Sequence, residues 1–131
     1  MTPITVRLDV RTRNYANGSQ GRTRAGMLAR AAEKRRLRDM TVQQCGTQLV
    51  GRMTSHTFHQ LRYDGCTITL TRIAPRQLDA HDGLRSALKP VCDGVADFFG
   101  CKDNDPRLEW VYRQERGKVR EYAVLITLEA R

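Results

Sequence analysis

Four aspartates occupy two short polar segments whose residue types suit a divalent cation. The first segment is Asp79-Ala-His-Asp82, and the second is Asp103-Asn-Asp105-Pro106. Metal-assisted phosphodiester hydrolysis needs several carboxylates around Mg²⁺ or Mn²⁺, because the ion must activate water and stabilise charge on the phosphate. Lys89 lies between the two segments in the sequence and could neutralise charge on the pentavalent phosphate. The two segments are therefore candidates for metal chemistry on a phosphodiester.

Each of these aspartates also has an ordinary structural interpretation. Asp82 precedes an apolar helical pattern and could be only an N-cap. The run from Asp103 to Pro106 has the composition of a common turn. Asp93 and Asp97 are four residues apart, as on a solvated helix face. Short motifs of this kind occur often without a bound metal, so the residue pattern leaves both interpretations open.

The charge of the chain is large and unevenly distributed. Lysine and arginine number 23 against 14 acidic residues, which gives a formal net charge of +9. Residues 1–52 carry 11 basic and 3 acidic side chains, net +8, and residues 79–109 carry 4 basic and 7 acidic ones, net −3. The excess of positive charge favours a polyanionic partner. The acidic segment in a basic protein is expected if it holds a cation that the phosphate also needs.

Length and composition limit the class of protein. With 131 residues, 40% of them hydrophobic, the chain suits one folded domain over 1–131. We divide it into a basic half at 1–52 and an acidic-site half at 64–131. No apolar run approaches the length of a membrane span, and charged residues interrupt any signal-peptide core near the N-terminus. We therefore expect a cytoplasmic protein that has no membrane partner. Four cysteines without metal-ligand spacing are expected to be small buried side chains.

The hydrophobic periodicity predicts a strand at 4–10, a loop at 11–21 and a helix at about 23–44 with Thr23 as its N-cap. Residues 46–63 give no clear pattern. A second strand is expected at 66–73, and a second helix at about 84–99, with Asp82 as cap and Gly100 as its end. Pro90 either kinks this helix or begins a new one. Two strands at 108–115 and 119–128 are predicted to form a hairpin around Arg116-Gly117-Lys118.

These elements indicate an α/β fold of the α+β type, with a mixed four-stranded sheet packed with two main helices. A helix over 84–99 is about 24 Å long, so it would hold the two aspartate segments at opposite ends. They can converge only if the helix bends at Pro90, if the second segment folds back, or if a second chain contributes.

Residues 70–110 resemble the RusA family of Holliday-junction resolvases, the crossover-junction endodeoxyribonucleases, and in particular its phage and prophage members. These proteins typically carry a leucine-aspartate pair, an aspartate-asparagine-leucine run, a lysine four residues before an aspartate, and a glycine-valine-aspartate-aspartate-x-aspartate-proline run. The similarity continues into Gln114-Glu115-Arg116-Gly117 and covers about the last 60 residues well and the first half loosely. The matching residues are Leu78, Asp79, Asp82, Leu84, Lys89, Asp93, Gly100, Asp103, Asp105, Pro106 and Trp110.

The resemblance implies a dimeric endonuclease that resolves Holliday junctions with Mg²⁺ in the cytoplasm of a phage-carrying bacterium. It implies that Asp79, Asp82, Asp103 and Asp105 are metal ligands and that Lys89 assists catalysis together with Asp79, Asp82 and Asp103. The chain departs from the pattern twice. Gly83 replaces the usual asparagine, and Lys102 replaces the first aspartate of the usual pair. A cation at Lys102 should weaken metal binding by like-charge repulsion.

Two hypotheses follow from these observations. In the first, the protein is a metal-dependent endonuclease that acts on branched double-stranded DNA, for recombination and repair. In the second, it has a RusA-like fold that no longer cleaves and has a structural or regulatory role on nucleic acid, as the two departures favour. In both, a group of basic residues would contact DNA phosphates without reading sequence. That group comprises Arg11, Arg13, Arg22, Arg24, Arg30, Lys34, Arg35, Arg36, Arg38, Arg72 and Arg76.

Overall fold

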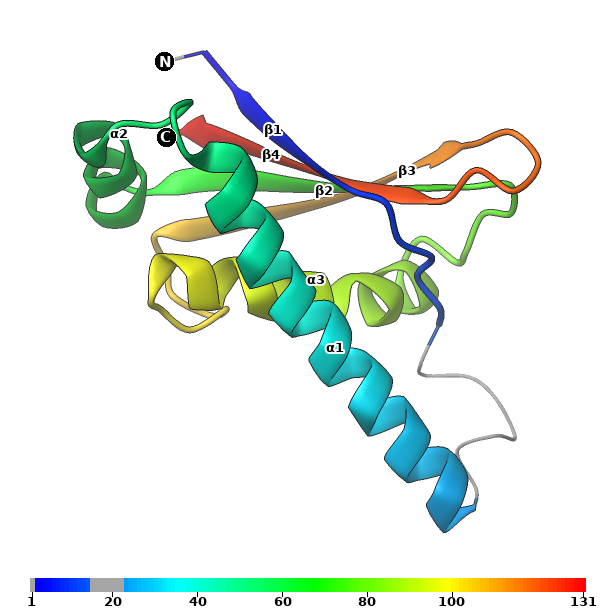
Figure 1. The fold of residues 1–131 in the computed structure, drawn as a ribbon. Coiled ribbons are helices and arrows are strands. Elements are labelled where there is room, and N and C mark those ends of the chain that lie inside the picture. The colour runs from blue at the N-terminus through cyan, green and yellow to red at the C-terminus, as the bar shows by residue number, and fades with distance from the viewer. Residues whose placement is uncertain (1, 15–22) are drawn as a thin grey trace.

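The computed structural model describes residues 2–14 and 23–131 and has the expected α+β architecture. Two long helices cover one face of a four-stranded mixed sheet (Figure 1). Along the chain the elements are β1 (Ile4–Leu8), α1 (Arg24–Leu49), α2 (Ser55–His59), the π-helical turn η2 (Gln60–Asp64), β2 (Cys66–Ala74), α3 (Asp82–Phe99), β3 (Leu108–Arg116) and β4 (Ala123–Ala130).

The strand order is β1-β4-β2-β3, which corrects the predicted hairpin. β3 and β4 follow each other in sequence, yet β2 lies between them, parallel to β3 and antiparallel to β4. Crossing one intervening strand requires about 10 Å, which the six residues 117–122 span easily. Gly117 donates its N–H to the carbonyl of Ala74 at 2.9 Å and so fixes the end of β3 to β2. The turn itself lies at Val119 and Arg120, after the predicted Arg116-Gly117-Lys118, and Arg116 is still part of β3.

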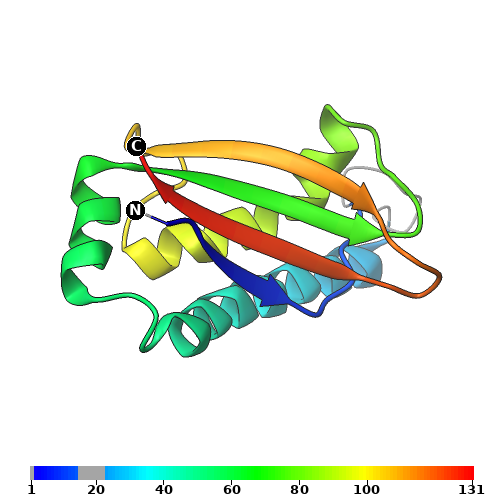
Figure 2. The ribbon, with the colours of Figure 1, turned by 90° about the horizontal axis from the view of Figure 1, so that it is seen from above.

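Strands β1, β2 and β3 run in the same direction, and β4 runs opposite to them (Figure 2). The segments that leave these strands therefore meet at one edge of the sheet. They comprise residues 9–14 after β1, residues 75–81 after β2 and residues 117–122 after β3. We call these three segments the carboxyl edge of the sheet.

Helix α1 begins where it was predicted and ends five residues later. The Oγ1 atom of Thr23 accepts the N–H of Gly26 at 3.0 Å, which confirms the N-cap. The helix continues to Leu49 because Thr41, Cys45 and Leu49 are buried at intervals of four residues. Its first half projects beyond the sheet (Figure 1). Within residues 2–14 and 23–131, every helix is too short or too polar to span a bilayer.

Helix α3 is continuous through Pro90 and begins two residues before its predicted start. Asp82 is its first residue, and its N-cap position is held by His81 without a side-chain cap. Gly100 ends the helix in the left-handed region, with φ at +71°, as the sequence predicts. Nearly the whole apolar face of α3 is buried against the sheet and α1. The core includes Val6, Leu8, Ile68, Leu70, Leu88, Val91, Val95, Ile126 and Leu128.

Candidate metal and nucleic-acid site

One side of α3 presents charged residues to solvent. Asp82, Lys89 and Asp93 lie at spacings of seven and four residues, which places them along one face of the helix. Asp82 and Lys89 are exposed, and Asp93 is half-buried. The rise of an α-helix separates Asp82 from Lys89 by about 10 Å and from Asp93 by about 16 Å along the axis. The charged face therefore has two separate ends.

Lys89 joins two carboxylates at the middle of this face. Its Nζ donates to Asp93 Oδ1 at 2.9 Å and also forms a hydrogen bond and ion pair with Asp103. Partial burial lowers the pKa of Lys89, but the hydrogen bonds to Asp103 and Asp93 outweigh this effect and raise it above the ordinary value. The same bond from Lys89 holds the pKa of Asp103 below its usual range. Both groups are therefore charged at neutral pH.

The loop after α3 folds back to bring Asp103 to Lys89. The indole Nε1 of Trp110, in β3, donates to the backbone carbonyl of Asp103 at 2.7 Å and holds this loop. Folding back was one of the three ways in which the sequence allowed the aspartate segments to approach. It joins two of the predicted catalytic residues, Lys89 and Asp103, but it does not bring either of them to Asp79 or Asp82.

Among the described residues, Cys92, Asp93 and Asp103 form a group that could hold a metal ion, with ligand atoms within 4.8 Å of one another. Cys92 is buried, and burial raises the pKa of its thiol to about 12. Its Sγ accepts a long contact from the hydroxyl of Tyr112 at 3.8 Å. At neutral pH Cys92 is therefore a protonated thiol, and the two carboxylates are the available anionic ligands.

Asp79 lies in the segment after β2, at the carboxyl edge, and Asp82 is the first residue of α3. Asp79 Oδ1 accepts the N–H of His81 at 2.9 Å, and the Asp79 carbonyl accepts the N–H of Leu84 at 2.8 Å. Gly83 is buried, and a Cβ there would lie 3.1 Å from Asn14 Nδ2. The asparagine of the RusA pattern would therefore be crowded at this position. Asp79 and Asp82 remain candidate ligands at a place distinct from Asp103.

Asp105 binds arginine on another side of the loop. Its Oδ1 accepts the backbone N–H of Arg107 at 2.9 Å, and its Oδ2 accepts from the Arg107 guanidinium at 2.8 Å. Arg62 Nη1 lies 3.9 Å from the same Oδ2. Arg107 lowers the pKa of this carboxyl to about 2. These contacts match the turn interpretation of Asp105 and leave it apart from the Lys89 group.

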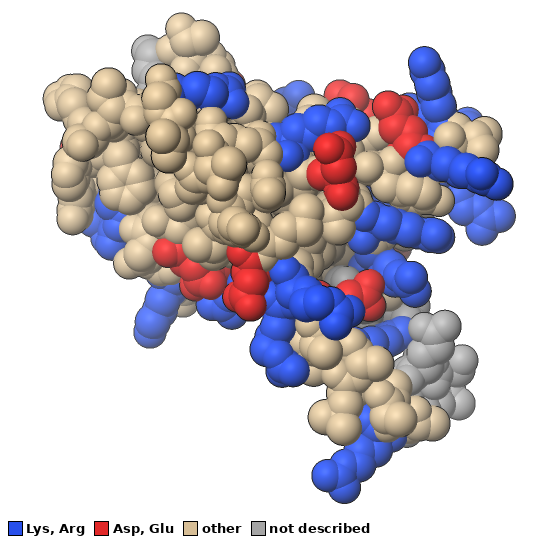
Figure 3. All heavy atoms as spheres, viewed as in Figure 1, with Lys and Arg blue, Asp and Glu red and all other residues tan. Residues whose placement is uncertain are grey.

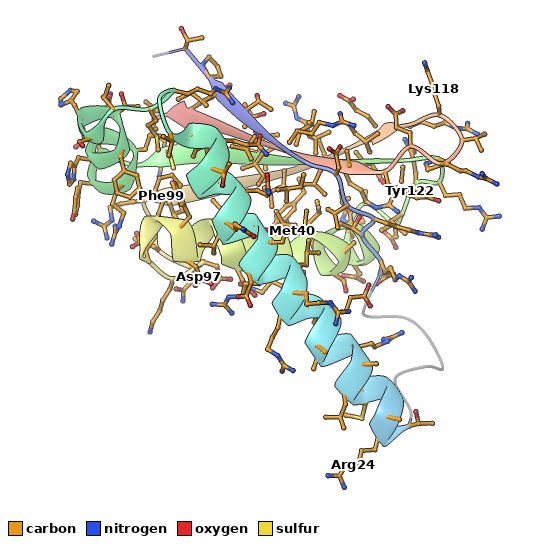
Figure 4. The ribbon with its side chains drawn as sticks, in the orientation of Figure 1. Arg24, Met40, Asp97, Phe99, Lys118 and Tyr122 are labelled. Carbon is orange, nitrogen blue, oxygen red and sulfur yellow. The ribbon has the colours of Figure 1, made fainter. Side chains whose placement is uncertain are left out.

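The basic residues of α1 extend along an exposed helix (Figure 3). Arg24 lies at its projecting tip (Figure 4). Arg38 binds both carboxylate oxygens of Asp97, at 2.5 and 2.8 Å, and so links α1 to α3. Arg13 forms an ion pair with Glu33 at 3.4 Å. Arg22 lies outside the described residues. The other exposed members of this helical group are Lys34, Arg35 and Arg36.

The second basic group lies at the carboxyl edge, where Figure 3 shows several blue side chains around the β3–β4 loop. Arg11 and Arg76 are exposed there. Arg72, which was predicted to contact DNA phosphates, is only 6% exposed. It donates to Thr12 Oγ1 at 3.0 Å and to the carbonyl of Arg76 at 2.7 Å. Arg72 therefore connects the segment after β1 to the segment after β2.

Two of these placements have a signal in the sequence that the initial interpretation did not use. Asp93 stands four residues after Lys89, the spacing of a helical ion pair, but it was matched only to the RusA-type pattern and otherwise interpreted as part of a solvated face, not as a metal ligand. Arg72 stands two residues after Leu70, on the strand face that is buried at every second position. Comparison with known protein families and with curated proteins found no match to the chain.

Proposed function

We propose that the protein is a metal-dependent endonuclease that cuts branched DNA, with Mg²⁺ or Mn²⁺ as its ion. The observation that carries this proposal is the meeting of Asp93, Asp103 and Lys89 on an exposed face of α3 in a strongly basic protein. Carboxylates and a lysine are the groups that phosphodiester hydrolysis needs. The resemblance to RusA-type resolvases, which rests on the same helix, supports a four-way junction as substrate and a bacterial cytoplasm as location.

The donor set fits a hard divalent cation. Asp93 and Asp103 would hold it, since Mg²⁺ and Mn²⁺ prefer carboxylate oxygens and keep several waters. The protonated thiol of Cys92 adds no charge to the donor set. When bound, the ion supplies an activated water and stabilises charge on the phosphate. Lys89 would then be released from its carboxylates and would neutralise charge on the phosphate from the same face of α3.

The basic residues would hold the DNA on either side of this face. Helix α1 is 26 residues long, which is about 39 Å and enough to follow several phosphates of one duplex arm. Arg11 and Arg76 at the carboxyl edge would contact a second part of the junction. Such contacts depend on the positions of phosphates and not on base sequence, so recognition would depend on junction shape.

A homodimer is part of this proposal. Asp82 lies about 16 Å from Asp93 along α3, so one chain does not gather all the predicted ligands at one ion. A second copy could bring its own first turn of α3 to the Asp93 and Asp103 carboxylates. Sedimentation velocity at assay concentration would give the mass of the active species. Full activity of a monomer would refute the homodimer and would leave the proposed role of Lys89 unaffected.

A second function is favoured by other observations. Lys89 neutralises both carboxylates, Lys102 adds a cation beside them, and Gly83 replaces the expected asparagine. These features fit a nucleic-acid-binding protein that has lost cleavage and keeps a structural or regulatory role. The two functions share DNA binding and differ in whether a cut product forms.

A labelled four-way junction separates them. Wild-type protein, Asp103→Asn and Asp82→Asn are incubated with the junction in Mg²⁺, in Mn²⁺ and in EDTA. Asp64→Asn is the matched control, because Asp64 is exposed and has no ion pair among the described residues. The endonuclease predicts metal-dependent nicks that Asp103→Asn abolishes while binding is retained. Tight binding that needs no metal, with no product at high protein concentration, supports the second function instead.

A further inference from the structure

The guanidinium of Arg72 is buried without a carboxylate partner. Only 6% of the residue is exposed, and its two hydrogen bonds go to neutral acceptors, the Thr12 hydroxyl and the Arg76 carbonyl. Within the described part of the chain, no acidic oxygen lies within ion-pair distance of it. Arginine has five N–H donors, so these two bonds leave donors available. Buried charges in proteins are as a rule paired, so this one calls for an anion.

Arg72 faces a small pocket that other arginines also line. The pocket has a volume of about 250 Å³, and its wall includes Arg11, Arg13, Arg76 and Tyr122. Arg11 lies over the ring of Tyr122, with 4.7 Å from its guanidinium carbon to the ring centroid. This contact fixes a second positive charge at the pocket. Figure 4 shows Tyr122 at the end of the sheet from which the segment after β1 departs.

The charges around the pocket repel one another when nothing negative is present. Burial lowers the pKa of Arg72, and the positive charge of Arg11 lowers it further. Of the four arginines, only Arg13 has an ion pair among the described residues, with Glu33. An anion in the pocket would relieve this repulsion and give the guanidinium groups charge-assisted partners.

The position of the pocket in the fold also favours a ligand. It lies at the carboxyl edge, where the segments after β1 and β2 meet, and ligands of open α/β sheets bind outside the carboxyl ends of strands. Leu78 forms part of its wall, and Asp79 follows directly in the chain. Asn14, also in the wall, lies against Gly83 in the first turn of α3. A group bound here is therefore held beside Asp79 and Asp82.

We infer that this pocket binds one phosphate group of the nucleic-acid backbone and places it next to the first turn of α3. The inference rests on the proposed function for the identity of the partner, a phosphodiester of DNA. The pocket itself is defined by the buried Arg72 and by Arg11 and Arg76, which are exposed and have no ion pair among the described residues. Arg72 would donate from within, while Arg11 and Arg76 would close over the phosphate from the solvent side.

Inorganic phosphate is the probe for the pocket alone. Titration is followed by the NMR signal of the Arg72 Nε–H group and by thermal unfolding, with chloride at equal ionic strength as reference. We expect a saturable shift of that signal, and binding about tenfold weaker in the Arg11→Gln, Arg76→Gln double variant. Both residues are exposed, so the fold tolerates the change. Arg113→Gln, which removes one charge from an exposed position of β3 outside the pocket wall, should bind phosphate like wild type.

Equal phosphate binding by the double variant and wild type would overturn the inference, as would a wild-type Arg72 signal that phosphate does not move. Either result leaves the proposed function intact if the junction is still bound and cut. Conversely, if the protein binds phosphate saturably but does not bind DNA, the proposed function is refuted and the phosphate site in the pocket is retained.

DNA binding provides a second readout. The slope of log affinity against log salt counts the phosphates neutralised, at about 0.9 for each one in duplex DNA. Because the arginines share a single phosphate, the double variant should lower the slope by about 1 and each single variant by no more than that. A drop of about 2 would mean that Arg11 and Arg76 contact separate phosphates, which contradicts a shared pocket.

Discussion

Replacing Lys89 by methionine should change metal binding and cleavage in opposite directions. In the free protein the Lys89 ammonium occupies the oxygens of Asp93 and Asp103 that a divalent ion would use. Methionine keeps an unbranched side chain of similar length and removes the charge. The metal then has no internal competitor, so it should bind more tightly. Cleavage should nevertheless fall, because the group that neutralises the phosphate is missing.

The size of the effect follows from the exposure of the groups. The side chains of Lys89 and Asp103 are 52% and 41% exposed, so solvent screens their attraction. Exposed ion pairs contribute about 0.2–1 kcal/mol each. Two such contacts to one lysine amount to about 1 kcal/mol, which corresponds to roughly fivefold in affinity. Loss of the charge-stabilising group should slow cleavage by about 100-fold or more.

The assay is a titration with Mn²⁺, in which the free ion is counted by its electron paramagnetic resonance signal. Lys102→Met is the matched control, since Lys102 is next to Asp103 in sequence, is exposed and has no ion pair among the described residues. It removes the same charge without removing a contact, so its Mn²⁺ affinity should change less than that of Lys89→Met. An unchanged or weaker Mn²⁺ affinity in folded Lys89→Met would refute the competition between lysine and metal.

Three further predictions concern stability and pH. Asp103→Asn should lower the free energy of unfolding at pH 7 by about 0.5–1 kcal/mol. Lys89 holds the pKa of Asp103 in the native protein below the unfolded value of about 3.9. The stability difference between wild type and Asp103→Asn is therefore full above pH of about 3.9, and it should disappear in an acid titration as the pH falls through the native pKa. Gly94→Ala should lower the free energy of unfolding in urea by about 1–3 kcal/mol, because the new Cβ would lie 2.7 Å from the Arg38 carbonyl oxygen in α1. The control Gly46→Ala should raise the free energy of unfolding, because a Cβ there meets nothing within 4 Å and alanine favours the helix. A double-mutant cycle of Arg38→Gln and Asp97→Asn should give a coupling of at most about 1 kcal/mol, because both side chains are more than a third exposed; a coupling of zero would mean that the pair does not hold α1 to α3.

The sequence predicts the two long helices and the four strands because their signals are local, whereas residues 46–63, which include α2, gave no clear pattern. The N-cap Thr23, the terminal Gly100 and the alternating apolar residues of β2 each determine structure within a few residues. Which strand pairs with β3 is not determined by local signals. Gly117 marks the end of β3, but whether the next strand pairs with β3 or crosses β2 depends on contacts between distant parts of the chain, which one residue does not specify.

The same distinction applies to the candidate site. Lys89 and Asp93 meet through helical spacing, which the sequence contains. Asp103 reaches Lys89 only because Trp110 in β3 binds its backbone carbonyl, and that contact requires the packed sheet edge. Arg72 is a basic residue, as a DNA contact would be, but it occupies a strand position that faces the core, and this position determines its burial. Charge alone therefore overestimates how many arginines lie on the surface.

The central claim is that this protein cuts branched DNA with a divalent metal, and product formation from a labelled four-way junction tests it most directly. We predict paired nicks near the branch point with wild-type protein in Mg²⁺ or Mn²⁺, no nicks in EDTA, and none with folded, junction-binding Asp103→Asn. Wild-type protein that saturates the junction and yields no nick in either metal would contradict the claim.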